Sequence, residues 1–142
     1  MIKTYDPTLV TVTWGPYEFQ GFMDGTSIEV DYNADASTLH MGLKGTATRI
    51  KSADQSGRFT ITLAQGSSTN TDLAAAHAAD RLPGANVKYP MTVADAAGAA
   101  IKAFGAQAWI VKSPKLERGK DLSPAVWIFE TDALKLNVAG ND

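Results

Sequence analysis

The sequence predicts a mainly β fold, either an antiparallel β-sandwich or a partly open barrel, with one α-helix. Short segments alternate apolar and polar residues, as half-buried strands do. Glycine, proline and Asp-Gly turn signals separate these segments at short intervals. One alanine-rich segment has the composition of a helix. We therefore expect roughly eight strands and one helix, in a single domain that spans residues 1–142.

Two segments show the strand pattern most clearly. In residues 26–33 the apolar side chains Ile28, Val30 and Tyr32 lie on even positions, and the odd positions are all polar. Residues 58–65 invert the order, with the apolar side chains Phe59, Ile61 and Leu63 on odd positions. The polar positions include Ser27, Glu29 and Asp31 in the first segment and Arg58, Thr60 and Thr62 in the second. Each strand thus has one dry face for a core and one wet face.

The remaining strands follow from the same reasoning. Further strands are expected at residues 8–14, 17–22, 90–94, 99–111 and 126–138. The strand at 99–111 contains Gly105, which predicts a break or bulge there. The last segment is either a strand pair or one bent strand. Asp24-Gly25 predicts a hairpin turn, and another turn is expected at 95–98.

A helix is expected over residues 73–82, where five of the ten residues are alanine. Thr69 is the expected cap, and Asp72 lies three residues later, as in a capping box. Pro83-Gly84 is expected to end the helix.

A protruding hairpin is predicted at about residues 37–56. This segment combines apolar residues that have no obvious core with several basic residues. They are Leu39, Met41, Leu43, Lys44, Arg49, Ile50 and Lys51. We interpret the segment as a docking element between subunits or between rings of subunits. The alternative is a flexible surface loop.

The composition excludes several classes of function. The chain has no cysteine, which removes disulfides, thiolate metal sites and thiol nucleophiles. Its formal net charge is −2, so no basic surface for gripping nucleic acid is expected. No segment reaches the ~20 apolar residues of a membrane-spanning helix, and no membrane association is expected.

The sequence lacks a recognisable catalytic or metal-binding motif. His40 and His77 have no ligand spacing around them. Residues 31–35 imitate the start of a calcium loop, but Ala36 and Gly42 stand where that loop needs glycine and glutamate. We expect no enzyme activity and no cofactor, although a carboxylate pair of the glycosidase kind leaves no local motif.

Several segments resemble tail tube proteins of contractile-tailed bacteriophages, the myoviruses. The resemblance is carried, in order along the chain, by Lys3-Thr4-Tyr5-Asp6-Pro7, Gly21-Phe22-Met23-Asp24-Gly25-Thr26, Ser52-Ala53-Asp54-Gln55-Ser56-Gly57, Phe59-Thr60-Ile61-Thr62-Leu63, Gln65, Asp95-Ala96-Ala97-Gly98, Ala108-Trp109-Ile110, Pro114 and Trp127. The order of the segments is more specific than any one of them. The central hairpin and the alanine-rich segment match least.

This resemblance implies a structural virion protein. Members of that family close into hexameric rings, and the rings stack into the inner tail tube, whose wall is a shared barrel. A contractile sheath surrounds the tube, and baseplate and tail-terminator proteins lie at its ends. Genomic DNA passes through without binding. The resemblance thus implies a location in the phage tail, after assembly in the cytoplasm of the host bacterium.

Combined with the strand pattern, the resemblance suggests which residues line the channel. We expect Ser27, Glu29, Asp31, Thr60 and Thr62 to face the lumen. An acidic or neutral lining would repel or ignore DNA phosphates, so the genome could slide. The alternative is that these residues form the solvated face of a monomeric sheet.

Other functions remain open at this point. A baseplate tube-initiator or the tube protein of a contractile bacteriocin would use the same architecture. A monomeric β-sandwich binding module would instead expose a flat aromatic patch. An enzyme on a β scaffold would have a concave site with converging polar groups.

Overall fold

The computed structural model describes residues 10–22, 27–95, 100–121 and 123–138. These residues form ten strands and one helix: β1 (Val10–Trp14), β2 (Tyr17–Glu18), β3 (Ile28–Tyr32), β4 (Ser37–Met41), β5 (Ala47–Lys51), β6 (Gly57–Ala64), α1 (Ser68–Asp80), β7 (Tyr89–Asp95), β8 (Ala100–Lys112), β9 (Pro124–Thr131) and β10 (Leu134–Leu136). The expected Asp24-Gly25 turn and most of the expected turn at 95–98 lie outside the described residues.

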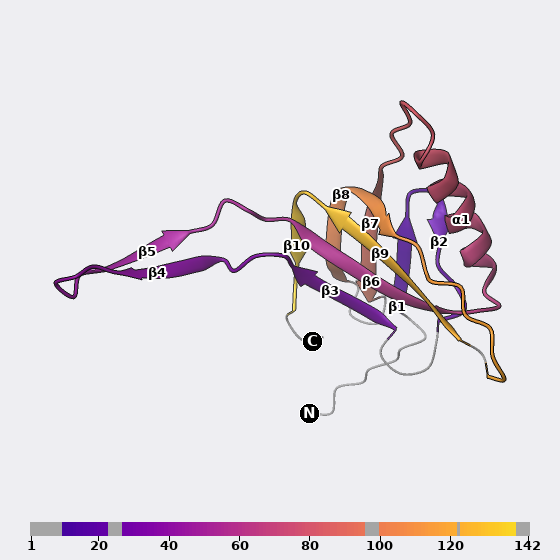
Figure 1. Ribbon diagram of the computed structural model, residues 1–142, viewed down its shortest axis with the longest axis horizontal. Helices are drawn as coiled ribbons and strands as arrows, with labels where there is room; N and C mark the ends of the chain where they lie inside the picture. Colours follow the sequence, from indigo (N-terminus) through magenta and orange to yellow (C-terminus); the bar gives the residue numbers. More distant parts are fainter. Residues whose placement is uncertain (1–9, 23–26, 96–99, 122, 139–142) are drawn as a thin grey trace.

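Eight of the strands form one curved antiparallel sheet (Figure 1). Its order is β2-β1-β7-β8-β9-β6-β3, and β10 pairs with β8 beside β9. The predicted fold class, mainly antiparallel β with one helix, is confirmed. The path of the sheet begins at β2 and ends at β3, so it is not closed into a barrel within the described residues.

The long strand β8 pairs with three other strands, β7, β9 and β10, and it contains a bulge. Tyr89 of β7 pairs with Ala108, but Met91, two residues on, pairs with Gly105, three residues back. One extra residue therefore lies on β8 at this point, which is a β-bulge. The bulge falls where Gly105 predicted a break. Beyond the bulge β8 pairs with β9, and before it β8 pairs with β10, so the final segment is one strand bent into two.

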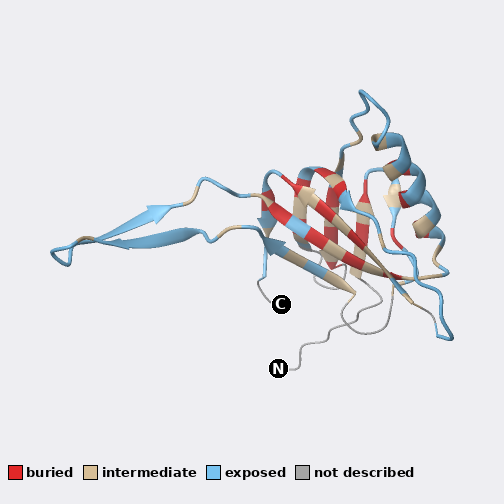
Figure 2. Cartoon of the chain, in the orientation of Figure 1, coloured by how far each residue is buried: buried red, intermediate tan, exposed pale blue. Residues whose placement is uncertain are grey.

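The core lies on the concave face of the sheet. Phe59, Ile61 and Leu63 of β6 are completely buried, as their alternation predicted. Figure 2 shows buried residues alternating with others along the central strands. Trp14 packs edge-on against Phe129 with ring centroids 5.1 Å apart, and its indole N–H donates to the carbonyl of Ala108 at 2.9 Å. The tryptophan thus satisfies its one polar atom inside the core.

The start of the helix differs from the prediction. Ser67 is the N-cap, with an extended backbone, and its hydroxyl accepts the Thr69 N–H at 3.3 Å. Thr69, the expected cap, is buried instead and accepts the Gln20 N–H at 3.0 Å. The expected capping box with Asp72 is therefore wrong, because the helix begins earlier than the alanine run suggests. Arg81 ends the helix ahead of Pro83.

One polar side chain fixes the helix to the sheet. The amide nitrogen of Asn70 donates to the carbonyls of Ala64 and Gln65, and its oxygen accepts the indole N–H of Trp127 at 2.9 Å. Leu73 and Ala76, on the same side of α1, are buried in the core. The helix lies at the end of the molecule opposite the β4–β5 hairpin (Figure 1).

Candidate assembly surfaces

A two-stranded hairpin projects from the main sheet (Figures 1 and 2). It consists of residues 37–51, which we call the arm, and its strands β4 and β5 pair only with each other among the described residues. All ten strand residues are exposed. Leu43 at the tip is fully exposed, and Leu39, Met41 and Ile50 each expose more than half of their surface. Clustered apolar exposure of this kind marks interaction surfaces.

The arm has two unlike faces. Residues directly opposite each other in an antiparallel pair share a face. The register pairs Leu39 with Arg49, Met41 with Ala47 and Ser37 with Lys51, which places apolar and basic side chains on one face. The other face carries Thr38, His40, Thr48 and Ile50. The first face, which we call the basic-apolar face, contains four of the residues that the sequence singled out.

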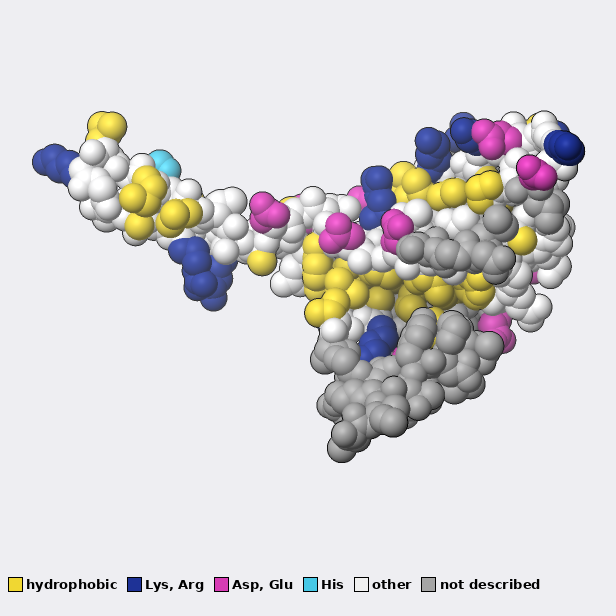
Figure 3. Space-filling view, turned by 90° about the horizontal axis from the view of Figure 1, so that it is seen from below, with side chains coloured by type: hydrophobic (Ala, Val, Ile, Leu, Met, Phe, Trp, Pro, Cys, Tyr) yellow, Lys and Arg dark blue, Asp and Glu magenta, His cyan; other side chains and the backbone are white. Residues whose placement is uncertain are grey.

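The arm carries only positive formal charge. Lys44, Arg49 and Lys51 are its charged residues, and no acid occurs between residues 37 and 51. Figure 3 shows Lys and Arg side chains beside hydrophobic ones along the arm, with acidic side chains beginning where the arm meets the body. The arm is therefore suited to an acidic surface that also offers apolar contact.

The arm joins the body through residues 33–36 and 52–56, which we call the root. The ladder between β3 and β6 ends where the Asn33 N–H donates to the carbonyl of Ser56 at 3.0 Å. The ladder of the arm begins where the Ser52 N–H donates to the carbonyl of Ala36 at 2.9 Å. Two residues lie between these bonds on one strand and three on the other. The two ladders are therefore not continuous.

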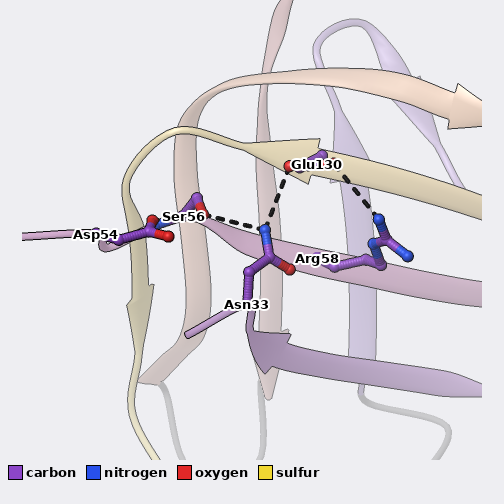
Figure 4. A network of polar contacts seen from close by, with 5 residues as sticks. All are labelled: Asn33, Asp54, Ser56, Arg58 and Glu130. Carbon is purple, nitrogen blue, oxygen red and sulfur yellow. Dashed lines mark hydrogen bonds and ion pairs between the residues drawn. The ribbon is translucent and has the colours of Figure 1, made fainter. Parts of the chain in front are cut away.

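A chain of polar side chains crosses this interruption (Figure 4). The Asp54 N–H donates to Ser52 Oγ at 3.1 Å, and Asp54 Oδ1 accepts from Ser56 N at 2.9 Å and Ser56 Oγ at 2.6 Å. Asn33 Nδ2 donates to Ser56 Oγ at 3.1 Å and to Glu130 Oε1 at 3.2 Å. Glu130 Oε2 lies 3.6 Å from the guanidinium of Arg58. The chain thus runs from Ser52, the root residue next to the arm, to β9.

Asp54 is held in its charged form by these contacts. The hydroxyl and the backbone N–H of Ser56 both donate to its carboxylate, and they lower the pKa of Asp54 below its ordinary value of 3.8. Asp54 therefore accepts both bonds throughout the neutral pH range.

The predicted lumen residues share one face of the sheet. Glu29 is paired with Thr60 and Asp31 with Arg58, and the carbonyl of Ser27 accepts the Thr62 N–H at 2.8 Å. The same face continues onto β9, where Ile128 stands opposite Thr60 and Glu130 opposite Arg58. The structure thus brings Ser27, Glu29, Asp31, Thr60 and Thr62 together.

This polar side of the sheet, which we call the wet face, carries both acidic and basic residues. Across β3, β6, β9 and the end of β8, the register gathers the acids Glu29, Asp31 and Glu130 with the bases Arg58 and Lys112. The formal charge of the set is −1. Half-buried Val126 and Ile128 lie among them. A weakly acidic face of this composition has no array of cations for holding phosphates.

Both ends of the sheet path have an edge that no described strand covers. On β3, the odd-numbered neighbours Ser27 and Asn33 bond to β6, so the backbone groups of Ile28, Val30 and Tyr32 point the other way. At the far end of the path, β2 pairs only with β1 among the described residues. Edges of this kind accept another strand.

The sequence reasoning missed the polar chain at the root. It singled out neither Asn33, Arg58 nor Glu130 as a group, because they lie on three strands that are distant in sequence. The local pattern Ser52-x-Asp54-x-Ser56 was the available signal, since alternating hydroxyl and carboxyl groups favour side-chain to backbone bonds.

The structure offers no candidate metal centre within the described residues. No three His, Cys, Asp or Glu side chains gather there in a way that could hold an ion. His40 lies on the arm and His77 on α1. In the same part of the chain, no helix has the length and apolar character needed to cross a membrane.

Solved chains from tube-containing assemblies share this fold. A chain of the anti-feeding prophage cap, the tube-terminating cap, superposes with a TM-score of 0.59 over 98% of this chain and 95% of that one, at 13% identity. The sheath/tube terminator of the PVC extracellular contractile injection system gives 0.59, 14% identity, and 96% and 99% coverage. The PVC sheath-tube complex gives 0.58, 14% identity, and 96% and 93% coverage. At these identities the likeness shows the fold alone.

A curated relative is similar in sequence over nearly the whole chain. Structural protein ORF10 of Pseudomonas phage KPP10 is 26% identical over 146 aligned residues, which cover 98% of this chain and 84% of ORF10. No protein-family model matches the sequence.

Proposed function

We propose that this chain is the tube subunit of a contractile phage tail. Six copies close into a ring, rings stack into the inner tube, and the channel carries the genome during ejection. The observation that carries the proposal is the arm, whose exposed apolar residues and positive charges have no partner among the described residues of the body. The similarity to a phage structural protein and the shared fold with chains of tube-containing assemblies support it.

The open sheet supports ring closure. A head-to-tail interface between identical copies makes a ring if the rotation closes. The edges of β3 and β2, with which no further described strand pairs, lie at opposite ends of the sheet path, so the sheet of one copy can continue into that of the next. Such a continuous wall would be a barrel shared by all copies, and it would leave no sheet edge exposed.

The wet face is proposed to line the channel. Ser27, Glu29, Asp31, Thr60 and Thr62 share it, and its weak negative charge disfavours phosphate binding. A density map of assembled tubes tests this directly, because Glu29 and Asp31 must point into the bore. Side chains of these two residues on the outer surface of the tube would refute the assignment.

The arm is proposed to dock onto a neighbouring copy, between subunits or between rings. Deleting residues 37–51 should leave a folded monomer that does not polymerise, because the arm makes no core contact. Substituting Leu39→Ser and Met41→Ser on the basic-apolar face should also abolish tubes. The matched control, Thr38→Ser and Thr48→Ser on the other face, should polymerise normally. Sedimentation and negative-stain microscopy detect the tubes. Normal tubes formed by the deletion variant would contradict the proposal.

The same proposal implies its partners and location. A tube subunit meets the tail sheath on its outer surface and meets baseplate and tail-terminator proteins at its ends. Its place is the virion, after assembly in the cytoplasm of the bacterial host. DNA is a passing cargo and not a ligand.

A second candidate is a tube-terminating cap. The chains of the tube-terminating cap and of the sheath/tube terminator both superpose with TM-scores of 0.59. A cap would form single rings and add to the end of a tube without elongating. A tube-initiator of the baseplate would likewise not elongate alone. Long tubes from the purified chain support the subunit function, and rings that do not stack support the cap.

A further inference from the structure

The direction of the arm depends on a small region. The arm is exposed along both strands, so the described contacts between arm and body are concentrated at the root. The ten residue steps from Asn33 to Leu43 span at most roughly 33 Å, so a swing of about 10° at the root moves the tip by up to about 6 Å. A displacement of that size at the tip would separate the side chains of a specific interface, because such an interface is packed as closely as a protein interior.

The backbone alone holds the root at few points. The carbonyl of Gln55 accepts the Leu134 N–H at 2.8 Å, and Gln55 bridges to Ala133. Next to this point the ladder is interrupted, and a groove of about 600 Å³ lies between the root and β10, lined in part by Tyr32, Ser52 and Leu136. The groove leaves space into which the arm could tilt around Gln55.

The polar chain of Figure 4 supplies a second point of attachment. Ser56 Oγ is its centre, because it donates to Asp54 on the arm side and accepts from Asn33 on the body side. Asn33 then reaches Glu130 on β9, which Arg58 holds from the other oxygen. The attachment at Glu130, added to the one at Gln55 and to the two strands that enter the root, further restricts the angle of the arm.

We propose that Ser52, Asp54, Ser56, Asn33 and Glu130 form a brace that sets the direction of the arm. The brace acts by positioning the arm. Its consequence for assembly rests on the proposed docking function: a braced arm arrives at the neighbouring copy already oriented, so association does not lose the conformational freedom of a swinging arm.

Distance measurements between spin labels test the brace in the monomer. The chain has no cysteine, so Lys44→Cys at the tip can be combined with Asp72→Cys on α1 or Lys135→Cys on β10 without background labelling. Double electron–electron resonance should give one narrow distance distribution for each pair of spin labels. Ser56→Ala should broaden or shift both by several ångströms. Ser56→Thr keeps the hydroxyl and should preserve them, as should the control Ser37→Ala on the arm.

A donor–acceptor exchange tests the second half of the brace. Asn33→Asp places a carboxylate against Glu130 and should broaden the distributions. Adding Glu130→Gln supplies an amide that can donate to the new carboxylate, and it should narrow them again. Circular dichroism and melting temperature confirm that each variant is folded. Unchanged distributions in Ser56→Ala and Asn33→Asp, or broad ones in the unsubstituted protein, would overturn the brace.

Assembly is the second measurement. The critical concentration for polymerisation should rise at least tenfold in Ser56→Ala and return toward the original value in Ser56→Thr. If the protein never polymerises, the docking function fails, while the label distances still decide whether the brace exists. Equal critical concentrations in the presence of broadened distances would show that the arm angle does not matter for assembly.

Discussion

Two buried threonines show that the same side chain can have opposite effects on stability. Thr131 is completely buried, and its Oγ1 has no hydrogen-bond partner among the described residues. Thr69 is nearly as buried, but its hydroxyl accepts the Gln20 N–H. A buried hydroxyl without a partner loses its bonds to water and gains none in return. Replacing each threonine by valine, which has nearly the same shape, separates the two cases.

We expect Thr131→Val to raise the free energy of unfolding by about 1 kcal/mol, because it removes an unsatisfied polar group. Thr69→Val should lower it by about 1–2 kcal/mol, because it leaves the Gln20 N–H without its acceptor. Urea titrations measure the free energy of unfolding of each variant, and the comparison requires equal m-values. Equal losses in both variants would show that the hydroxyl of Thr131 is satisfied in solution.

Gly57 is a site where one added carbon should be costly. A Cβ at this position would lie 2.6 Å from Leu134 Cβ and closer still to the end of that side chain. Gly57→Ala must therefore displace β10, and it should cost about 1–3 kcal/mol of unfolding free energy. Gly66→Ala is the control, since its Cβ would meet nothing within 4 Å. A Gly57→Ala variant as stable as the control would mean that β10 moves away at no cost.

At the scale of elements, local patterns predicted what local chemistry determines. The alternation in β6 gave its buried face correctly, and Gly105 marked the bulge in β8. The helix start was wrong because Ser67 and Thr69 are both competent caps, and the choice depends on Gln20, which is far away in sequence. The contact that decides between two local possibilities is then a tertiary one.

The root illustrates the same limit for the candidate site. The composition of the arm was visible in the sequence, since apolar and basic residues without a core stand out. The pairing of Asn33 with Glu130 was not, because it depends on β3, β6 and β9 lying side by side in a particular register. Sequence patterns indicate which face a residue occupies, but not which distant residue stands next to it.

The root should respond to acid. The pKa of Asp54 is lowered because Ser56 donates two bonds to the charged carboxylate. A lowered pKa means that these bonds are fully present above the ordinary value of 3.8 and are lost as the pH falls through the lowered one. The Ser56 amide resonance should therefore titrate with a midpoint below 3.8.

A matched variant identifies the group that titrates. Asp54→Asn keeps an acceptor oxygen but has no proton to gain in this range, so the transition should disappear. The label distances at the arm tip should broaden over the same pH interval in the unsubstituted protein. A midpoint at or above the ordinary value would contradict the assignment of the two bonds.

At the scale of the whole molecule, charge is segregated. The formal net charge of −2 divides into +3 on residues 37–51 and therefore −5 on the rest of the chain. The arm and α1 lie at opposite ends of the long axis (Figure 1). A molecule with a positive arm and a negative body attracts a second copy head to tail and repels it body to body. This asymmetry favours the heterologous contacts that the proposed rings and stacks would need.

Salt should therefore weaken assembly. At an ionic strength of about 0.01 M the screening length is roughly 30 Å, and at about 1 M it is roughly 3 Å. The rate of polymerisation should fall between these conditions, because screening removes the attraction between arm and body. In a variant with Arg49→Gln and Lys51→Gln the rate should be lower at low salt and should depend much less on salt. A rate that rises with salt in the unsubstituted protein would show that apolar contacts by Leu39 and Met41 dominate, and that the charges of the arm do not direct the encounter.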